Sequence, residues 1–305
     1  MKRLSWLGLG FWLAGVALTS DAATSPKKAQ PAASATAKKT GNGNRIARDP
    51  YLGAIVVDAT SGRVLFEDHA DAKGYPASVL KLMDLLILLE KLQQGQVNLQ
   101  DPVQVSARAS KTGGSQVWLA EKESFSIDEM LYALMVQSAN DAAVALAEKI
   151  AGTTEAFVEL MNQRARELGM TGSIFRSPHG LPPAAGQEHD VTTARDLSLL
   201  CRALLKHPET LRYTSVRERP FRPNSGKTVI MRTHNHLLGH VEGCDGLKTG
   251  FTGQAGYSMA VTASRNGQRV IVVVLDSVDR KTRDAKASEL IAKGFAALAA
   301  PPAKR

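Results

Sequence analysis

Ser78 and Lys81 are the pair of residues in this 305-residue chain best suited to nucleophilic catalysis. The lysine follows the serine by three positions, so on a helix both side chains lie on one face and the amine reaches the hydroxyl. The free N–H groups and positive end of such a helix favour an oxyanion. Apolar surroundings lower the pKa of a lysine, so that a neutral amine accepts the serine proton. Taken alone, the pair is better explained as a helix N-cap serine followed by a lysine that reaches to solvent.

Two further short patterns supply polar groups that such a reaction needs. Ser138-Ala-Asn140 falls at the break between two predicted helices, where side chains point into a cleft. The alternative there is ordinary turn chemistry, with Asn140 or Asp141 capping the second helix. Lys248-Thr249-Gly250 precedes a strong strand and is predicted at a sheet edge. There, Lys248 and Thr249 would hold a carboxylate, and the backbone N–H after Gly250 would meet an oxyanion.

Each of these patterns also occurs elsewhere in the chain, so position has to decide between the copies. Ser25-Pro-Lys-Lys28 and Lys39-Thr-Gly41 lie in a segment with almost no apolar residues, and Lys111-Thr-Gly113 lies in a polar loop. Ser264-Arg-Asn266 lies at a predicted hairpin turn. The copies at Ser78, Ser138 and Lys248 follow one another in order and border predicted helices or strands.

The elements predicted around these residues indicate an α+β fold. Alternating and continuous apolar runs predict strands over 53–58, 63–66, 256–263 and 269–275, and helical patterns cover 78–92, 126–136, 141–150, 154–168, 193–206 and 282–298. The helix over 78–92 is apolar nearly all round and is expected at the centre of the fold. Strands at both ends of the chain with helices between them predict one antiparallel sheet, built from distant segments.

Composition limits the class of protein. With 44% hydrophobic and 22% charged residues, the chain is neither disordered, nor collagen-like, nor a multi-span membrane protein. The net charge of +9 suggests a nucleic-acid partner, but residues 1–50 hold eight Lys and Arg against two Asp, and so six of those nine charges. The remainder of the chain is nearly neutral, so we expect no nucleic-acid binding.

The first residues predict export. Lys2 and Arg3 precede an apolar run over 4–18 and small residues around Ala22, which is typical of a signal peptide (1–22) cleaved after Ala22; an uncleaved anchor is the alternative. Residues 23–49 predict a disordered basic linker, 50–300 a catalytic domain and 301–305 a tail. We therefore expect a protein of the periplasm or cell envelope, whose basic linker is either a solvated tether or makes weak contact with the envelope.

The cysteines and histidines give weaker signals. An exported protein permits a disulfide between Cys201 and Cys244, but Cys201 lies in an apolar helical run that favours a buried free thiol. His234-Asn-His236 with His240 has ligand-like spacing for zinc. No helical His-Glu motif accompanies these histidines, and we expect no metal and no cofactor.

The chain resembles the low-molecular-mass penicillin-binding proteins, the serine-type D-alanyl-D-alanine carboxypeptidases of peptidase family S11. The resemblance covers about residues 51–298. It rests on the three patterns and on the blocks Tyr75-Pro-Ala-Ser-Val-Leu-Lys-Leu-Met83, Gly113-Gly-Ser-Gln-Val-Trp-Leu119, Ser138-Ala-Asn-Asp-Ala142, His179-Gly-Leu181, Thr193-Ala-Arg-Asp196 and Asp245-Gly-Leu-Lys-Thr-Gly-Phe-Thr252. It implies a serine β-lactamase/DD-peptidase-like fold, an antiparallel sheet flanked by helices, with a mostly helical subdomain and the active site between them.

The resemblance also implies a role for each residue. Ser78 would be the acylated nucleophile and Lys81 its base, while Ser138 would relay a proton to the leaving D-alanine. The remaining roles are substrate binding by Asn140, Lys248, Thr249 and Gly250, and an oxyanion hole from the backbone N–H groups of Ser78 and Phe251. Peptidoglycan stem peptides would be the substrates, and β-lactam antibiotics covalent inhibitors.

The chain departs from the family pattern at two positions, and competing functions stay open. Leu80 and Asp84 stand where the family usually has Thr. Leu80 removes a hydroxyl near the base, which bears on rate and specificity more than on the chemistry. The chain is expected to end soon after its closing helix, as the short members of the family do. Some of those short members cleave peptide cross-links as endopeptidases. A β-lactamase would need a second carboxylate to activate water, and Glu159-Leu-Met-Asn162 has the wrong spacing. A zinc hydrolase and a non-catalytic cell-wall-binding protein are less favoured functions.

Overall fold

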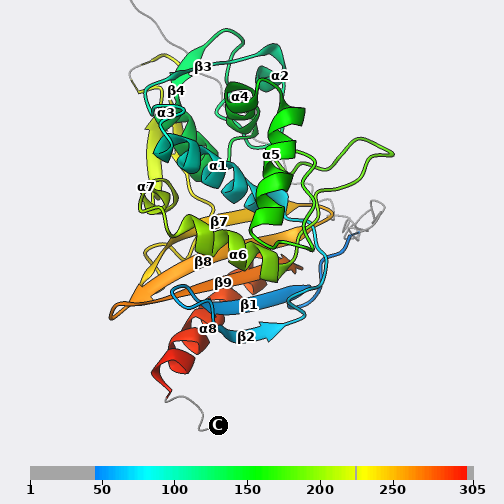
Figure 1. Cartoon of the computed structure of the whole chain (residues 1–305), viewed down its shortest axis with the longest axis vertical. Helices are drawn as coiled ribbons and strands as arrows, with labels where there is room; N and C mark the ends of the chain where they lie inside the picture. Colours follow the sequence, from blue (N-terminus) through cyan, green and yellow to red (C-terminus); the bar gives the residue numbers. More distant parts are fainter. Residues whose placement is uncertain (1–44, 224, 301–305) are drawn as a thin grey trace, which may run out of the picture. The chain divides into compact units, whose positions relative to one another are not determined.

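A five-stranded antiparallel sheet forms the centre of this computed structural model, which describes residues 45–223 and 225–300 (Figure 1). The strand order is β2-β1-β9-β8-β7. The strands are β1 (Gly53–Asp58), β2 (Val64–Asp68), β7 (Cys244–Thr252), β8 (Gly256–Arg265) and β9 (Gln268–Ser277). Because β1 pairs with β9, strands from both ends of the chain meet in one sheet, as the sequence predicted. The predicted position of the Lys248-Thr249-Gly250 pattern on an edge strand is also confirmed.

Both faces of the sheet are buried, because helices cover each of them. Ala54 and Val56 of β1 point into a core with α8 (Arg280–Ala299), whereas Ile55 and Val57 point into the larger core with the other helices. This alternation follows from the two-residue period of a strand. It explains why β8 and β9 are apolar almost without interruption, since their residues are buried on either side.

The helical part stands on the face of the sheet opposite α8 (Figure 1). A 3₁₀ turn, η1 (Ala77–Leu80), leads directly into α1 (Lys81–Gln93), whose first nine residues are all buried. Around α1 pack α4 (Asn140–Ala151), α5 (Thr154–Glu167), α6 (Ala194–Leu204) and α7 (Glu209–Thr214). The apolar helix predicted over 78–92 is therefore central, although its first turn is 3₁₀ rather than α.

The remaining elements are short. They are α2 (Ala107–Ser110), α3 (Ile127–Tyr132), a π-helical turn η2 (Ala133–Gln137), and the two-stranded pairs β3 (Pro102–Gln104) with β4 (Ser124–Ser126) and β5 (Glu218–Phe221) with β6 (Val229–Arg232). The sequence did not predict these two pairs, which are three or four residues long per strand. It did predict the starts of two helices, where Ser126 and Thr193 accept capping hydrogen bonds from backbone N–H groups.

The predictions for the terminal segments and for the cysteines have different outcomes. The predicted signal (1–22), residues 23–44 of the predicted linker and the tail (301–305) lie outside the described residues. Residues 45–49, also assigned to the linker, instead hydrogen-bond to the sheet region, Arg48 N–H to Asp276 O at 2.9 Å for example. No helix within 45–223 and 225–300 has the length and apolar character needed to cross a membrane. Cys201 and Cys244 are both buried free thiols.

Candidate active site

A cavity of about 400 Å³ lies between the edge strand β7 and the helical part of the fold. Six of the residues predicted from the sequence line it: Ser78, Ser138, Asn140, Thr249, Gly250 and Phe251. Lys81 and Lys248 lie directly behind this surface, 0% and 3% exposed, and both reach the hydroxyl groups at its centre. The structure thus brings together every predicted site residue from three distant segments of the chain.

Ser78 lies in the 3₁₀ turn that precedes α1, where its side chain is partly exposed while its neighbours are buried. The turn is tied by a hydrogen bond from Val79 N–H to Pro76 O at 3.0 Å. Ala77, immediately before the serine, has a φ of +45°, a left-handed conformation that L residues seldom adopt. Backbone strain of this kind is typical of residues held in place for function.

Lys81 is the first residue of α1, and its Nζ atom has three close oxygen neighbours. They are Ser78 Oγ at 2.9 Å, the backbone oxygen of Ser138 at 2.8 Å and Asn140 Oδ1 at 2.6 Å. The last two oxygens only accept hydrogen bonds, so they take the two N–H groups of a neutral amine. The lone pair of that amine is then left for the hydroxyl of Ser78, which is the geometry of a general base.

The protonation of Lys81 agrees with this arrangement. Burial lowers the pKa of Lys81 to about 7, against the charges of Asp84 and Asp141, which act in the opposite direction. A base is most effective when its pKa lies near the working pH, because a useful fraction is then unprotonated and still accepts protons well. Lys81 meets this condition near neutral pH.

Ser138 projects its hydroxyl between the two buried lysines. Its Oγ lies 2.9 Å from Lys248 Nζ and 3.4 Å from Lys81 Nζ. The residue follows the π-helical turn η2 and has a φ of 62°, again left-handed and strained for a residue other than glycine. Such π turns occur often at functional sites. This backbone directs Ser138 into the cavity, as the predicted break between two helices implied.

Asn140 does not cap the helix that it begins. The N-cap of α4 is Ala139 and receives no side-chain hydrogen bond, so the capping alternative is wrong for Asn140. Its Oδ1 accepts from Lys81, and its Nδ2 donates to Gly113 O at 2.8 Å. The amide therefore orients the lysine and fastens the 113–115 loop that lines the cavity, two functions that the sequence did not reveal.

Asp141, the next residue, is a second anchor for that loop. Its carboxylate accepts hydrogen bonds from the backbone N–H groups of Val117 and Leu119, at 3.2 Å and 3.0 Å for Oδ2. Burial raises the pKa of Asp141, and these N–H donors oppose the rise. The loop carrying Gly114 and Ser115 is thus held against α4 by two consecutive residues of the Ser-Ala-Asn-Asp block.

The edge strand β7 approaches the nucleophile so closely that glycine is required at position 250. A Cβ atom on Gly250 would lie 2.7 Å from Pro76 O and 3.0 Å from Ser78 N. The backbone of β7 therefore lies directly against the backbone of η1. The next residue, Phe251, is 53% exposed at the rim of the cavity and packs on Tyr257, with ring centroids 4.3 Å apart.

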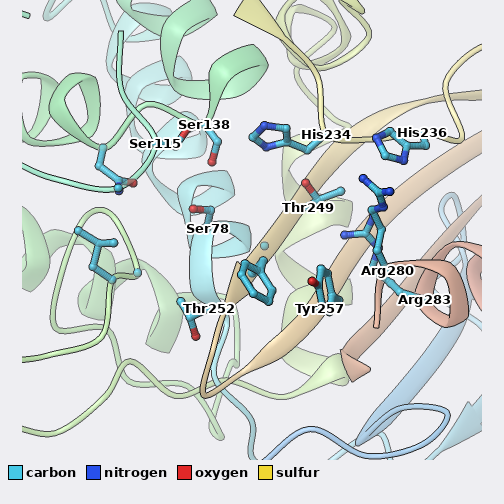
Figure 2. A pocket seen from close by; sticks show the side chains of 16 residues that line it. Ser78, Ser115, Ser138, His234, His236, Thr249, Thr252, Tyr257, Arg280 and Arg283 are labelled. Atoms are coloured by element: carbon cyan, nitrogen blue, oxygen red, sulfur yellow. The ribbon is translucent and has the colours of Figure 1, made fainter. Parts of the chain in front are cut away.

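The far end of the cavity is cationic. Its cations are Arg280 and Arg283, which Figure 2 shows beside His236 on the side of Thr249 that points away from Ser78. Burial and the charges of Lys81 and Arg283 lower the pKa of Lys248 well below its ordinary value. A bound carboxylate would offset this repulsion. No sequence pattern indicated the two arginines, which follow β9 and reach the cavity only because α8 packs on the sheet.

The zinc alternative has little structural support in the described part of the chain. His234 and His236 line the cavity, whereas His240 does not. Within residues 45–223 and 225–300 no three or more His, Cys, Asp and Glu side chains are grouped so that they could hold a metal ion.

Known proteins are similar to this chain over most of the described residues. A family model described as D-alanyl-D-alanine carboxypeptidase matches residues 50–279. The chain is 33% identical to D-alanyl-D-alanine carboxypeptidase DacF of Bacillus subtilis over 264 residues, which cover 87% of this chain and 67% of DacF. It is 36% identical to DacC of Escherichia coli over 248 residues, which cover 79% of this chain and only 60% of that protein.

Two further similarities bear on function and fold. A D-alanyl-D-alanine endopeptidase of Pseudomonas aeruginosa is 33% identical over 249 residues, which cover 78% of this chain and 74% of that protein. The crystal structure of penicillin-binding protein D2 from Listeria monocytogenes in an ampicillin-bound form is similar with a TM-score of 0.70 and 32% identity. That similarity covers 81% of this chain and 97% of the Listeria chain.

Proposed function

This chain belongs to the D-alanyl-D-alanine carboxypeptidase family, peptidase family S11, and we propose that it removes the terminal D-alanine from peptidoglycan stem pentapeptides through an acyl-enzyme on Ser78. One observation carries the proposal. Lys81 Nζ lies 2.9 Å from Ser78 Oγ, and its other two close neighbours are oxygens that only accept hydrogen bonds. A neutral lysine is thereby directed at the serine proton.

Acylation follows from this geometry. Lys81 takes the proton of Ser78 while Oγ attacks the carbonyl carbon of the penultimate D-alanine. The resulting oxyanion would be stabilised by the backbone N–H groups of Ser78 and Phe251. Removing one such donor typically costs about 2.7–4 kcal/mol of transition-state stabilisation. The close approach of β7 to η1 at Gly250 supports this pairing of the two segments.

Ser138 and the cationic end of the cavity would complete the acylation half of the reaction. When the C–N bond breaks, the leaving D-alanine nitrogen takes the Ser138 proton, and Ser138 regains one from the Lys81 ammonium 3.4 Å away. Lys248 and Thr249 would bind the terminal carboxylate. A water molecule then attacks the ester, with Lys81 again accepting the proton, and the shortened peptide is released. The amide of Asn140 would contact the substrate while it holds Lys81.

The expected partners follow from the same site. Because the Listeria protein of similar structure has an ampicillin-bound form, β-lactams are expected to acylate Ser78 in place of the peptide. We infer an extracytoplasmic location, at the cell envelope where peptidoglycan lies, and expect no nucleic-acid partner. The basic segment before residue 45 would contribute a weak envelope contact at most.

A second candidate function is endopeptidase cleavage of peptidoglycan cross-links. It is favoured by the Pseudomonas endopeptidase, of which this chain covers 74%, a larger share than of DacF or DacC. Both reactions use the same acyl-enzyme and differ in the leaving group, a free D-alanine or the side-chain amine of a second stem peptide.

Purified protein given a synthetic pentapeptide or a cross-linked dimer separates these functions. D-alanine release from the pentapeptide, unchanged by a chelator, supports the carboxypeptidase. Cleavage of the dimer alone would establish the endopeptidase instead. Loss of either reaction on chelation would contradict the serine mechanism, and a Ser78→Ala variant measured in parallel should release nothing.

A further inference from the structure

Asp84 lies one helical turn after Lys81 on α1 and is 1% exposed. Neither of its carboxylate oxygens has a hydrogen-bond partner among the described residues. A buried carboxylate without a protein donor is costly. Burial accordingly raises the pKa of Asp84 well above its ordinary value, and the positive charge of Lys81 opposes that rise. The chain has this unfavourable carboxyl group one helical turn from Lys81, the proposed general base, so Asp84 calls for a functional explanation.

The other buried carboxyl groups near Lys81 or Asp84 accept hydrogen bonds from the protein. Asp141 accepts from the N–H groups of the 117–119 loop, and Asp190 accepts from two backbone N–H groups and the hydroxyl of Ser177. Both thus have evident structural functions as anchors of loops. Asp84 anchors no described segment, and it interacts with Lys81 and Asp190 only through their charges.

The two buried lysines of the site show what a neighbouring carboxyl group does. Lys248 has Lys81 and Arg283 as charged neighbours, and its pKa lies well below the ordinary value. Lys81 has Asp84 and Asp141 as neighbours, and its pKa falls only to about 7. Carboxylate charge therefore opposes desolvation at Lys81 and keeps it a competent base near neutral pH. Asp84 is the stronger of the two carboxyl influences on Lys81.

We propose that Asp84 is a positioning residue for acylation, whose carboxylate charge acts on Lys81 through the core and sets the pH range in which the amine takes the Ser78 proton. It touches neither substrate nor the reacting atoms. The inference rests on the proposed function, because it concerns Lys81 as the base. The other titratable groups that face this pair are Asp141 and Asp190, both carboxyls, His179, whose pKa burial and the Lys81 charge lower to about 4, and Lys248.

The test is the pH dependence of acylation by benzylpenicillin in the wild type and in Asp84→Asn. While Lys81 is protonated, its charge favours the ionised form of Asp84, and that carboxylate in turn raises the pKa of Lys81. Replacing Asp84 by Asn should therefore move the acidic limb of the profile, where the rate rises with pH, to lower pH. We expect a shift of at least about half a pH unit, or about a threefold faster reaction on the acidic limb. The plateau at high pH should fall, because the amine becomes a weaker base.

Two more variants sharpen this test. Asp84→Thr also removes the charge and should shift the limb in the same direction. Glu90→Gln removes a carboxylate from the same helix that pairs with Arg164 instead, and should leave the limb where it is. If the acidic limbs of both Asp84 variants coincide with that of the wild type, the inference is overturned and the proposed function stays intact.

A third measurement keeps Asp84 in place and needs no acylation. The side-chain carboxyl carbon of ¹³C-labelled Asp84 is titrated by NMR in the wild type and in Lys81→Met. Burial raises the pKa of Asp84 and the lysine charge opposes that rise, so the titration should move to still higher pH without the lysine. An unchanged midpoint contradicts the coupling. Absence of any penicillin adduct in the wild type would instead contradict the proposed function, whatever this titration shows.

Discussion

The amide oxygen of Asn140 accepts a hydrogen bond from Lys81 Nζ at 2.6 Å, the shortest of the contacts made by that amine. Because an amide oxygen is neutral, it orients the lysine without stabilising its charged form as strongly as a carboxylate would. The same Asn140 side chain donates to Gly113 O. Asn140 thus connects the general base to the loop that lines the cavity.

Replacing Asn140 by Asp tests whether that neutrality matters. A carboxylate at the same position would raise the pKa of Lys81 by about one unit or more. We expect the rate of benzylpenicillin acylation at pH 7 to fall at least about fivefold and to recover largely above pH 9. Asn140→Ala loses the contact without adding charge, so its rate should be reduced at every pH. An Asn140→Asp profile that follows the wild type would show that the amide does not control the base.

The hydroxyl of Ser138 is testable separately from its strained backbone. Ser138→Ala and Ser138→Gly both remove the proton relay, and each should lower D-alanine release by about 10²–10⁴-fold. Glycine adopts the φ of 62° without strain, so the glycine variant should unfold at a temperature no lower than the alanine variant. Activity in Ser138→Gly close to the wild type would show that the conformation, and not the hydroxyl, is required.

Gly250→Ala should separate β7 from the nucleophile. The new methyl group would lie 2.7 Å from Pro76 O, so strand and turn must move apart. Displacements of about 1 Å at a reacting group cost on the order of 10²-fold in rate, and we expect that loss in the acylation rate constant. Gly253→Ala, in the turn directly after β7, is the matched control, since its Cβ meets nothing within 4 Å. Equal rates in the two variants would argue against close contact at Gly250.

Much of the fold was predictable because its signals are local. The turn between β8 and β9 is an example, since Asn266 and Gly267 have φ angles of 48° and 75°, as the predicted hairpin turn requires. The long apolar runs and the capping residues Ser126 and Thr193 likewise depend on their immediate neighbours in sequence. The same is true of Ser78 and Lys81, which one helical turn brings together.

The parts that were not predictable depend on contacts between distant segments. Arg283 reaches the cavity through the packing of α8 on the sheet, which no pattern around residue 283 encodes. The π turn before Ser138 ends in a left-handed residue, and Asn140 shortly after it contacts Lys81, 59 positions earlier in the chain, instead of capping its helix. That Asp84 has no hydrogen-bond partner among the described residues is also a tertiary property, visible only when the surrounding core is complete.

The central claim, that Ser78 is the acylated nucleophile, is tested most directly by the intact mass of the purified protein after incubation with benzylpenicillin. We predict that the wild type gains the mass of one penicillin, that peptide mapping places it on Ser78, and that Ser78→Ala gains none. A wild type without an adduct, or a Ser78→Ala variant with an undiminished one, would contradict the assignment of Ser78.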